Sequence, residues 1–252
     1  MTHRIPGLGP VLLTVLIDLL GFGLVIPLLS FYAEEHGASE LQVTLLMAVY
    51  SIAQFVMAPI WGALSDRVGR RPVMIFSVAM TAAMLYGFAL ADSLWLLFLF
   101  RTLHGAGAAN ISTAQSYVAD VTTPENRARG MGLIGASFGL GFTLGPWIGG
   151  ELSRFGYRAP ILLAAGLAVL NLIWVALQLP ESRPPEAREA AAAGQRRTLS
   201  PGALLYGLRH PVVGLCIALT FVAVFAFAMM EGTFALVAEH RWSMDAAHVG
   251  RV

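Results

Sequence analysis

Seven long apolar runs constrain this chain more than any other feature of its sequence. Each has about 20 or more mostly apolar residues, the length that a helix needs to cross a bilayer. Backbone groups in lipid must pair internally, so we expect every run to be a helix, and the alternating segments of a β-barrel are absent. The sequence therefore predicts an all-α, polytopic membrane protein. The runs span residues 8–32, 41–64, 73–91, 94–118, 130–152, 159–179 and 211–237.

Composition excludes several other classes of protein. Only 12% of the residues are charged and 57% are hydrophobic, whereas a soluble domain has roughly 25% charged residues. The net charge of +1 gives no bulk attraction to nucleic acid. The one cysteine, Cys216, excludes an intramolecular disulfide and a cysteine-based metal cluster. Neither metal-ligand spacing nor a catalytic pair is present, so we predict no metal site, no cofactor and no enzyme.

The arginines predict the orientation of the chain. Eleven of the sixteen basic residues lie in breaks on one side of the predicted membrane, and four lie on the other. Positive-inside logic then places the N-terminus in the cytoplasm and, after seven spans, the C-terminus outside. The first run is longer than a signal-peptide core, so we expect an uncleaved anchor. The one long break, 180–210, which ends in the segment Leu199–Leu208, predicts a cytoplasmic linker with one surface helix.

Three charged residues lie inside the runs and away from their last two positions, namely Asp18, Arg101 and Glu231. A charge at mid-bilayer costs roughly 2.5–3.5 kcal/mol, so each is a functional candidate. At about 100° per residue, polar and small residues of the fourth run share one sector of a helix. This stripe predicts the wall of a water-filled cavity. It consists of Arg101, His104, Gly105, Ala108, Ser112 and Gln115.

Structural alternatives exist for these polar residues. Asp18 and Arg101 could form a buried ion pair with no part in transport. His104 could carry protons, because histidine titrates near neutral pH, or could fill space as a hydrogen-bonded side chain. Gln54 could line the cavity or join two helices. Glu231 lies close enough to the outer end of its run to reach water.

The break between the second and third runs holds a glycine- and arginine-rich motif. Glycines permit positive φ, so the segment predicts a tight turn with an acid and three arginines at the cytoplasmic surface. Alone, it could be a positive-inside stop signal. Its spacing, however, resembles the G-x-L-x-D-R-x-G-R-R loop between helices 2 and 3 of the major facilitator superfamily. The matching residues are Gly62, Asp66, Arg67, Gly69, Arg70 and Arg71.

Three more segments resemble the same family. The first run carries Asp18 and a kinking Pro27, and the fourth resembles the family's span-4 motif, whose arginine is associated with proton coupling. Spacing in the fifth run is typical of tight helix packing, and it also resembles the signature that separates proton-driven exporters from uptake members. Its matching residues are Gly132, Gly141, Gly145, Pro146, Gly149 and Gly150.

The resemblance is strongest to the tetracycline exporters of Gram-negative bacteria, in which an acid in span 1 and a glutamine in span 2 line the route. Asp18 and Gln54 stand at those places, and Arg101, His104 and Gln115 join them as predicted path residues. The resemblance implies proton-coupled efflux of small amphiphilic or drug-like molecules across the bacterial inner membrane, driven by the proton gradient. The alternatives are a solute uptake symporter and an inactive or assembly-only fragment.

The resemblance also implies a division of the chain. Residues 1–179 would form an N-terminal six-helix bundle, 180–210 the linker, and 211–252 a seventh helix that starts an incomplete C-terminal half. We therefore expect a truncated transporter that inserts in the membrane and catalyses no exchange alone, and we expect the glycine faces of the fifth run to lack a neighbour from the second half. Its expected partners are the lipid bilayer, a small-molecule substrate, and either a second copy or a complementary C-terminal half.

Overall fold

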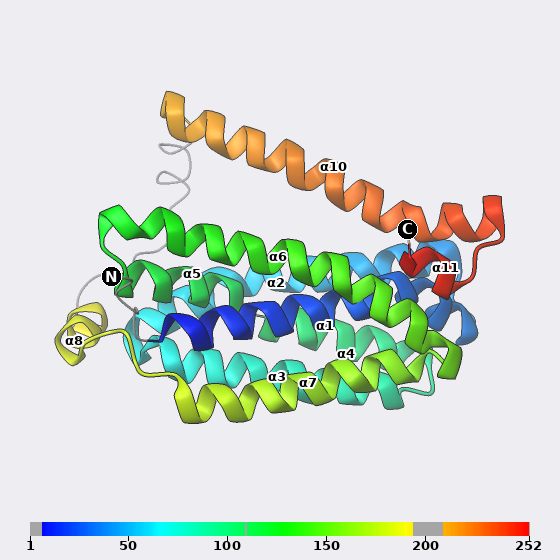
Figure 1. The fold of residues 1–252 in the computed structure, drawn as a ribbon, viewed down its shortest axis with the longest axis horizontal. Helices are drawn as coiled ribbons and strands as arrows, with labels where there is room; N and C mark the ends of the chain where they lie inside the picture. The colour runs from blue at the N-terminus through cyan, green and yellow to red at the C-terminus, as the bar shows by residue number, and fades with distance from the viewer. Residues whose placement is uncertain (1–6, 109, 194–208, 252) are drawn as a thin grey trace.

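The computed structural model describes residues 7–108, 110–193 and 209–251, and throughout these segments the regular secondary structure is helical. Figure 1 shows long helices that run side by side, with a short helix at either end of the bundle. The elements are α1 (Leu8–Glu35), α2 (Glu40–Val68), α3 (Arg70–Leu90), α4 (Leu94–Gly107), α5 (Asn110–Val121), α6 (Pro124–Leu152), η1 (Ser153–Phe155), α7 (Arg158–Gln178), α8 (Pro185–Ala193), α10 (Pro211–Trp242) and α11 (Ala246–Arg251).

The prediction of an all-α, polytopic membrane protein is confirmed. Six helical segments are long and apolar enough to cross a membrane, and they belong to α1, α2, α3, α6 with η1, α7 and α10. The fourth predicted span differs. It is divided into α4 and α5, which have 14 and 12 residues, with Ala108 outside helical geometry between them.

The break in the fourth span is held by side chains from neighbouring helices. Trp61 Nε1 donates to the Ala106 carbonyl at 2.6 Å, and Ser77 Oγ donates to the Gly107 carbonyl at 2.5 Å. Gly105 lets the chain approach α2 closely, since a Cβ there would lie 2.3 Å from the Tyr50 carbonyl oxygen. Non-helical backbone is tolerated at membrane depth only where the protein satisfies its polar groups, as these donors do.

Helices α1 and α6 are in close backbone contact. A Cβ on Gly145 would lie 2.7 Å from Gly23 Cα, and one on Gly149 would lie 2.6 Å from the Leu24 carbonyl oxygen. A Cβ on Gly141 would likewise lie 2.6 Å from the Leu19 Cβ. Small residues every four positions thus let the two backbones meet, as in small-xxx-small packing.

Helix α10 stands apart from the bundle along most of its length and approaches it towards its C-terminal end (Figure 1). None of the described residues from 211 to 230 is buried. The following helix, α11, packs on α6, where a Cβ on Gly250 would lie 2.3 Å from the Pro146 carbonyl oxygen. Within the predicted linker, α8 is a helix, whereas the segment 199–208 lies outside the described residues.

Candidate transport cavity and its polar network

A cavity of about 630 Å³ opens between α1–α7 and α10. Its wall is mostly apolar and carries five aromatic side chains, which come from α1, α2, α6 and α10. These are Phe22, Tyr50, Phe138, Phe142 and Phe227. Five other side chains bring polar atoms to the wall, namely Asp18, Gln54, Thr81, His104 and Asn110. A large apolar cavity with a few converging polar groups is the usual form of a small-molecule site.

Asp18 is the carboxyl group on this wall, and its partner is an asparagine. Asn110 Nδ2, at the start of α5, donates to Asp18 Oδ2. The other carboxyl oxygen of Asp18, Oδ1, and the amide oxygen of Asn110, Oδ1, are buried without a hydrogen-bond partner among the described residues. The ion pairs formed by the described residues do not include one between Asp18 and Arg101.

Arg101 lies behind the cavity wall rather than on it. The side chain is buried, and its guanidinium carbon lies 4.5 Å from the centre of the Tyr50 ring and 5.8 Å from that of Phe22. Such cation–π contacts are stronger in a desolvated site. His104 does line the cavity, with its ring edge-on to Tyr50 at 5.1 Å. The Tyr50 ring on α2 therefore contacts both the arginine and the histidine of α4.

The continuous polar stripe expected along the fourth span is not formed. His104 and Ala108 line the cavity, whereas Ser112 and Gln115 are exposed on α5 and are not among the residues on its wall. The reason is the break after Gly107, which interrupts the 100° progression that the stripe assumed. Beyond the break Asn110, instead of Ser112, turns inward.

Gln54 meets both alternatives considered for it. It lines the cavity, and its Nε2 also joins two helices by donating to the Ala108 carbonyl at 3.4 Å. The side chain of Glu231 lies outside the described part of the structure.

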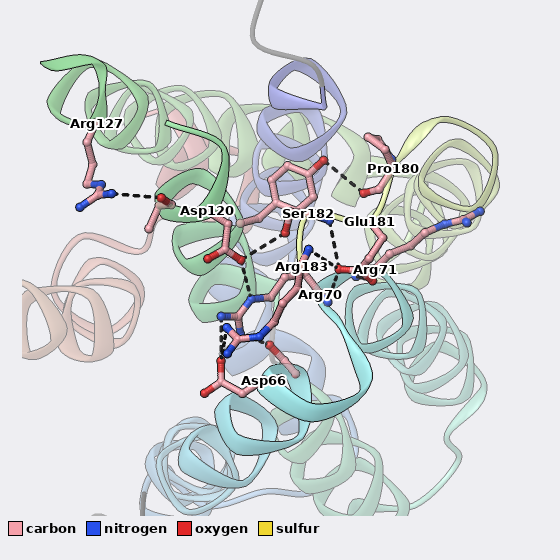
Figure 2. A network of polar contacts seen from close by, with 12 residues as sticks. Asp66, Arg70, Arg71, Asp120, Arg127, Pro180, Glu181, Ser182 and Arg183 are labelled. Atoms are coloured by element: carbon pink, nitrogen blue, oxygen red, sulfur yellow. Dashed lines mark hydrogen bonds and ion pairs between the residues drawn. The ribbon is translucent and has the colours of Figure 1, made fainter. Parts of the chain in front are cut away.

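The glycine- and arginine-rich motif forms the turn between α2 and α3, shown in Figure 2. Helix α2 continues through Gly62 and Asp66 to Val68, so the turn itself is the single residue Gly69, with φ of 111°. The predicted tight turn with a positive φ at glycine is confirmed. Arg67 is exposed, as expected of a surface residue.

Arg70 is buried, which corrects the expectation that the motif's arginines lie at the surface. Its side chain is 6% exposed and bridges two carboxylates, with Asp66 at 2.8 Å and Asp120 at 3.0 Å. Ser65 Oγ accepts a further hydrogen bond from it at 2.5 Å. Arg183, beyond α7, pairs with Asp66 at 3.0 Å, so two arginines balance two aspartates (Figure 2).

Glu181 caps the N-terminus of α3. Its carboxylate accepts the backbone N–H of Arg70 at 2.8 Å and that of Arg71 at 3.2 Å. A carboxylate at this position satisfies the unpaired amides of the helix terminus and interacts favourably with the helix dipole. Gly69 is favoured here by its positive φ, and a Cβ at this position would displace the Glu181 carboxylate, whose Oε2 would lie 2.3 Å from it. Arg71 also donates from Nη2 to the Ala176 carbonyl at 2.7 Å.

Four polar residues of these two clusters are not identified by the sequence patterns: Asn110, Asp120, Glu181 and Arg183. Each carries a weak signal. Asn110 is a polar side chain inside an apolar run, Asp120 follows that run directly, and the segment 181–183 has the composition of a linker. None is close in sequence to its partner, so no local pattern pairs them.

The glycines of α6 face three different environments. The face at 141, 145 and 149 meets α1, and Gly150 meets α11, with a Cβ placed 2.9 Å from the Ala246 carbonyl oxygen. The expectation that the glycine faces lack a neighbour from the second half is wrong for Gly150, which meets α11, whereas the neighbour of the face at 141, 145 and 149 is α1, a helix of the first half. The second stripe, Gly132, Gly135 and Gly139, is open: a Cβ added at any of the three would have no described atom within 4 Å.

Comparison with known proteins decides the family. A sequence profile described as Major Facilitator Superfamily matches residues 11–250. The chain belongs to the major facilitator superfamily. The members of this family are transporters rather than enzymes.

Several relatives and one solved structure extend this finding. The chain is 39% identical over 178 residues to tetracycline resistance protein, class C, of Escherichia coli, covering 69% of this chain and 45% of the relative. It is 27% identical over 239 residues to multidrug resistance protein 2 of Bacillus subtilis, covering 94% and 60%. Its fold matches the crystal structure of the human organic anion transporter MFSD10 with a TM-score of 0.76, at 28% identity over 97% and 67% of the two chains. The chain thus spans about half the length of these bacterial relatives.

Proposed function

We propose that this chain is part of a proton-coupled antiporter that exports small amphiphilic or drug-like molecules across the bacterial inner membrane. The observation that carries the proposal is the cavity of about 630 Å³, whose apolar, aromatic wall holds the carboxyl group of Asp18. An intramembrane carboxyl that lines a cavity can bind and release a proton while substrate occupies the same space.

The direction of transport rests on two supports. The glycines and proline of α6 resemble the exporter signature, and the glycines form the seam with α1 that borders the cavity. The bacterial relatives are named for resistance to tetracycline and to multiple drugs. Uptake by symport, the alternative direction, has neither support.

Within this proposal the path residues have different roles. Asp18 carries the proton, and Gln54 and His104 contribute polar atoms to the substrate's surroundings. Arg101 acts from behind the wall, where its charge is held against the Tyr50 ring. Gln115, which is exposed on α5, can contribute only through a partner that covers that face.

We also propose the orientation and a partner. With the N-terminus in the cytoplasm, alkaline phosphatase fused after Ser243 should be active and fused after Arg71 inactive, and the reverse pattern would contradict the topology.

The open stripe on α6 suits a second helical bundle, either a complementary half or a second copy. In a chain that also carries Cys216→Ala, Gly135→Cys would form a disulfide-linked dimer on oxidation only if the partner is a second copy of the chain.

The transport test uses proteoliposomes with an imposed pH gradient and a panel of amphiphilic dyes and antibiotics. The chain is reconstituted alone and together with a C-terminal bundle taken from the class C relative. We expect gradient-driven transport by the pair, and loss of it with Asp18→Asn or Arg101→Ala while both proteins remain in the membrane. Transport that ignores the gradient would refute the coupling. No transport by the pair would support the alternative of an assembly-only fragment.

A further inference from the structure

Tyr50 lies where α2 packs directly on α4. A Cβ on Gly105 would lie 2.3 Å from the Tyr50 carbonyl oxygen and 2.8 Å from its Cα, so the backbones of the two helices are in contact at this point. Arg101 and His104 stand on the same face of α4 as Gly105, because residues three and four positions apart are neighbours on a helix. Both side chains contact the Tyr50 ring. This tyrosine therefore meets the whole polar face of α4.

Two aromatic residues of the cavity wall cover the guanidinium of Arg101. Tyr50 and Phe22 both line the cavity, whereas Arg101 is only 3% exposed and is not on the wall. The guanidinium carbon lies over both rings, 4.5 Å from the centre of Tyr50 and 5.8 Å from that of Phe22. The two ring centres are 5.5 Å apart, so the rings adjoin. We call Tyr50 and Phe22 the aromatic screen.

The aromatic screen changes what a molecule in the cavity can bind. A guanidinium that reaches a desolvated cavity forms strong, often bidentate hydrogen bonds with a carboxylate or phosphate. Held against a ring face, the same group is stabilised by the ring electrons instead. The rings thus keep the positive charge of Arg101 away from the cavity contents. The wall itself presents the carboxyl group of Asp18 and no arginine among its described residues.

We infer that Tyr50 is a specificity-determining residue, whose ring keeps the guanidinium of Arg101 out of the cavity and so denies anionic molecules a binding partner there. The inference rests on the proposed function, because it concerns which molecules the same cavity admits. Tyr50 acts through Arg101 and is therefore a positioning residue, with Gly105 setting the close approach of its backbone. Phe22 contributes less, because it lies farther from the guanidinium.

Binding to the purified chain in nanodiscs tests the inference without any transport step. Two fluorescent probes share one dansyl group: dansyl aminocaproate, which carries a carboxylate, and its neutral primary amide. The readout is the ratio of their affinities, measured at about pH 8, where histidine is ordinarily neutral. The unaltered chain should bind the carboxylate no more tightly than the amide. Tyr50→Ala should raise the ratio in favour of the carboxylate by about 10-fold to 100-fold, the range for hydrogen bonds to a charged group.

Further variants separate the screen from the shape of the cavity. Tyr50→Phe keeps the ring face and should keep the ratio of the unaltered chain. Phe138→Ala is the matched control, because it removes another aromatic side chain from the wall but not one that Arg101 contacts. Arg101→Leu added to Tyr50→Ala should abolish the gain. If Tyr50→Ala does not fold, Phe22→Ala opens the other half of the screen and should give a smaller gain of the same sign.

The outcomes separate this inference from the proposed function. A ratio that neither Tyr50→Ala nor Phe22→Ala changes, or that Phe138→Ala raises equally, would overturn the screen and leave a drug-binding cavity in place. Tighter binding of the carboxylate by the unaltered chain would also overturn it, because the positive charge would then already be accessible. A gain that persists with Arg101→Leu would show that the charge belongs to another residue. Binding of neither probe to the unaltered chain would overturn both the inference and the cavity's proposed role.

Discussion

Replacing Gly145 with alanine is the sharpest test of the α1–α6 seam. The added Cβ would lie 2.7 Å from Gly23 Cα, 2.8 Å from Gly23 C and 3.0 Å from the Leu20 carbonyl oxygen. All three atoms belong to the backbone of α1, so no side chain can rotate away to make room. The two helices must separate, and their close contact is lost.

Gly139→Ala on the same helix is the matched control, because nothing lies within 4 Å of its Cβ position. Alanine is favoured over glycine in a helix interior by about 1 kcal/mol, and this gain is common to both variants. Their difference therefore isolates the clash. Overpacking of a closely packed site costs about 1–3 kcal/mol, so Gly145→Ala should be less stable than Gly139→Ala by that amount.

The assay is unfolding of the purified chain by SDS titration in mixed micelles, followed by far-UV circular dichroism and tryptophan fluorescence. Gly139→Ala should unfold at or above the SDS fraction of the unaltered chain, and Gly145→Ala clearly below it. Equal stability of the two variants would refute the close contact of α1 and α6. A Gly145→Ala variant that is more stable than the unaltered chain would refute the contact as well.

Three further predictions concern other polar contacts. Arg70→Met should lower the free energy of unfolding by about 3 kcal/mol because it leaves Asp120 without an arginine partner and Asp66 with Arg183 alone. Arg67→Met, at an exposed neighbour, should change it by less than about 0.5 kcal/mol, and equal effects in SDS titration would contradict the network. Trp61→Phe should cost about 1–3 kcal/mol by removing the donor at the α4–α5 break, and hydrogen exchange should rise there. Arg251→Gln, at the half-exposed ion pair with Glu151, should cost less than about 1 kcal/mol, and a larger loss in the same titration would refute a surface role.

Much of the fold follows from short-range features of the sequence. Each apolar run is long enough to span a bilayer, and lipid leaves a helix as the way to satisfy its backbone, so the spans can be predicted from length alone. The exception is the fourth run. Its break depends on Trp61 and Ser77, which belong to α2 and α3 and supply donors from 45 and 30 residues away.

The candidate site is predictable only in part for the same reason. A charged or polar side chain in an apolar run is visible in the sequence, so Asp18, Arg101 and His104 can be named, and the spacing of glycines on α6 indicates close packing. Their partners cannot be named in this way. Asn110 lies 92 residues from Asp18, and Glu181 lies 111 residues from the amide of Arg70 that it caps.

Sequence by itself determined which segments enter the membrane and which residues are costly there, because both depend on transfer of single side chains and backbone groups from water to lipid. Only the tertiary structure decided which of these polar side chains form hydrogen bonds with one another. Once the break in the fourth span has redirected α5, Asn110 faces Asp18 and Gln115 faces outward. Hydrogen bonds act over about 3 Å, so pairing depends on where the packed helices bring their atoms, and no periodicity along one helix encodes that.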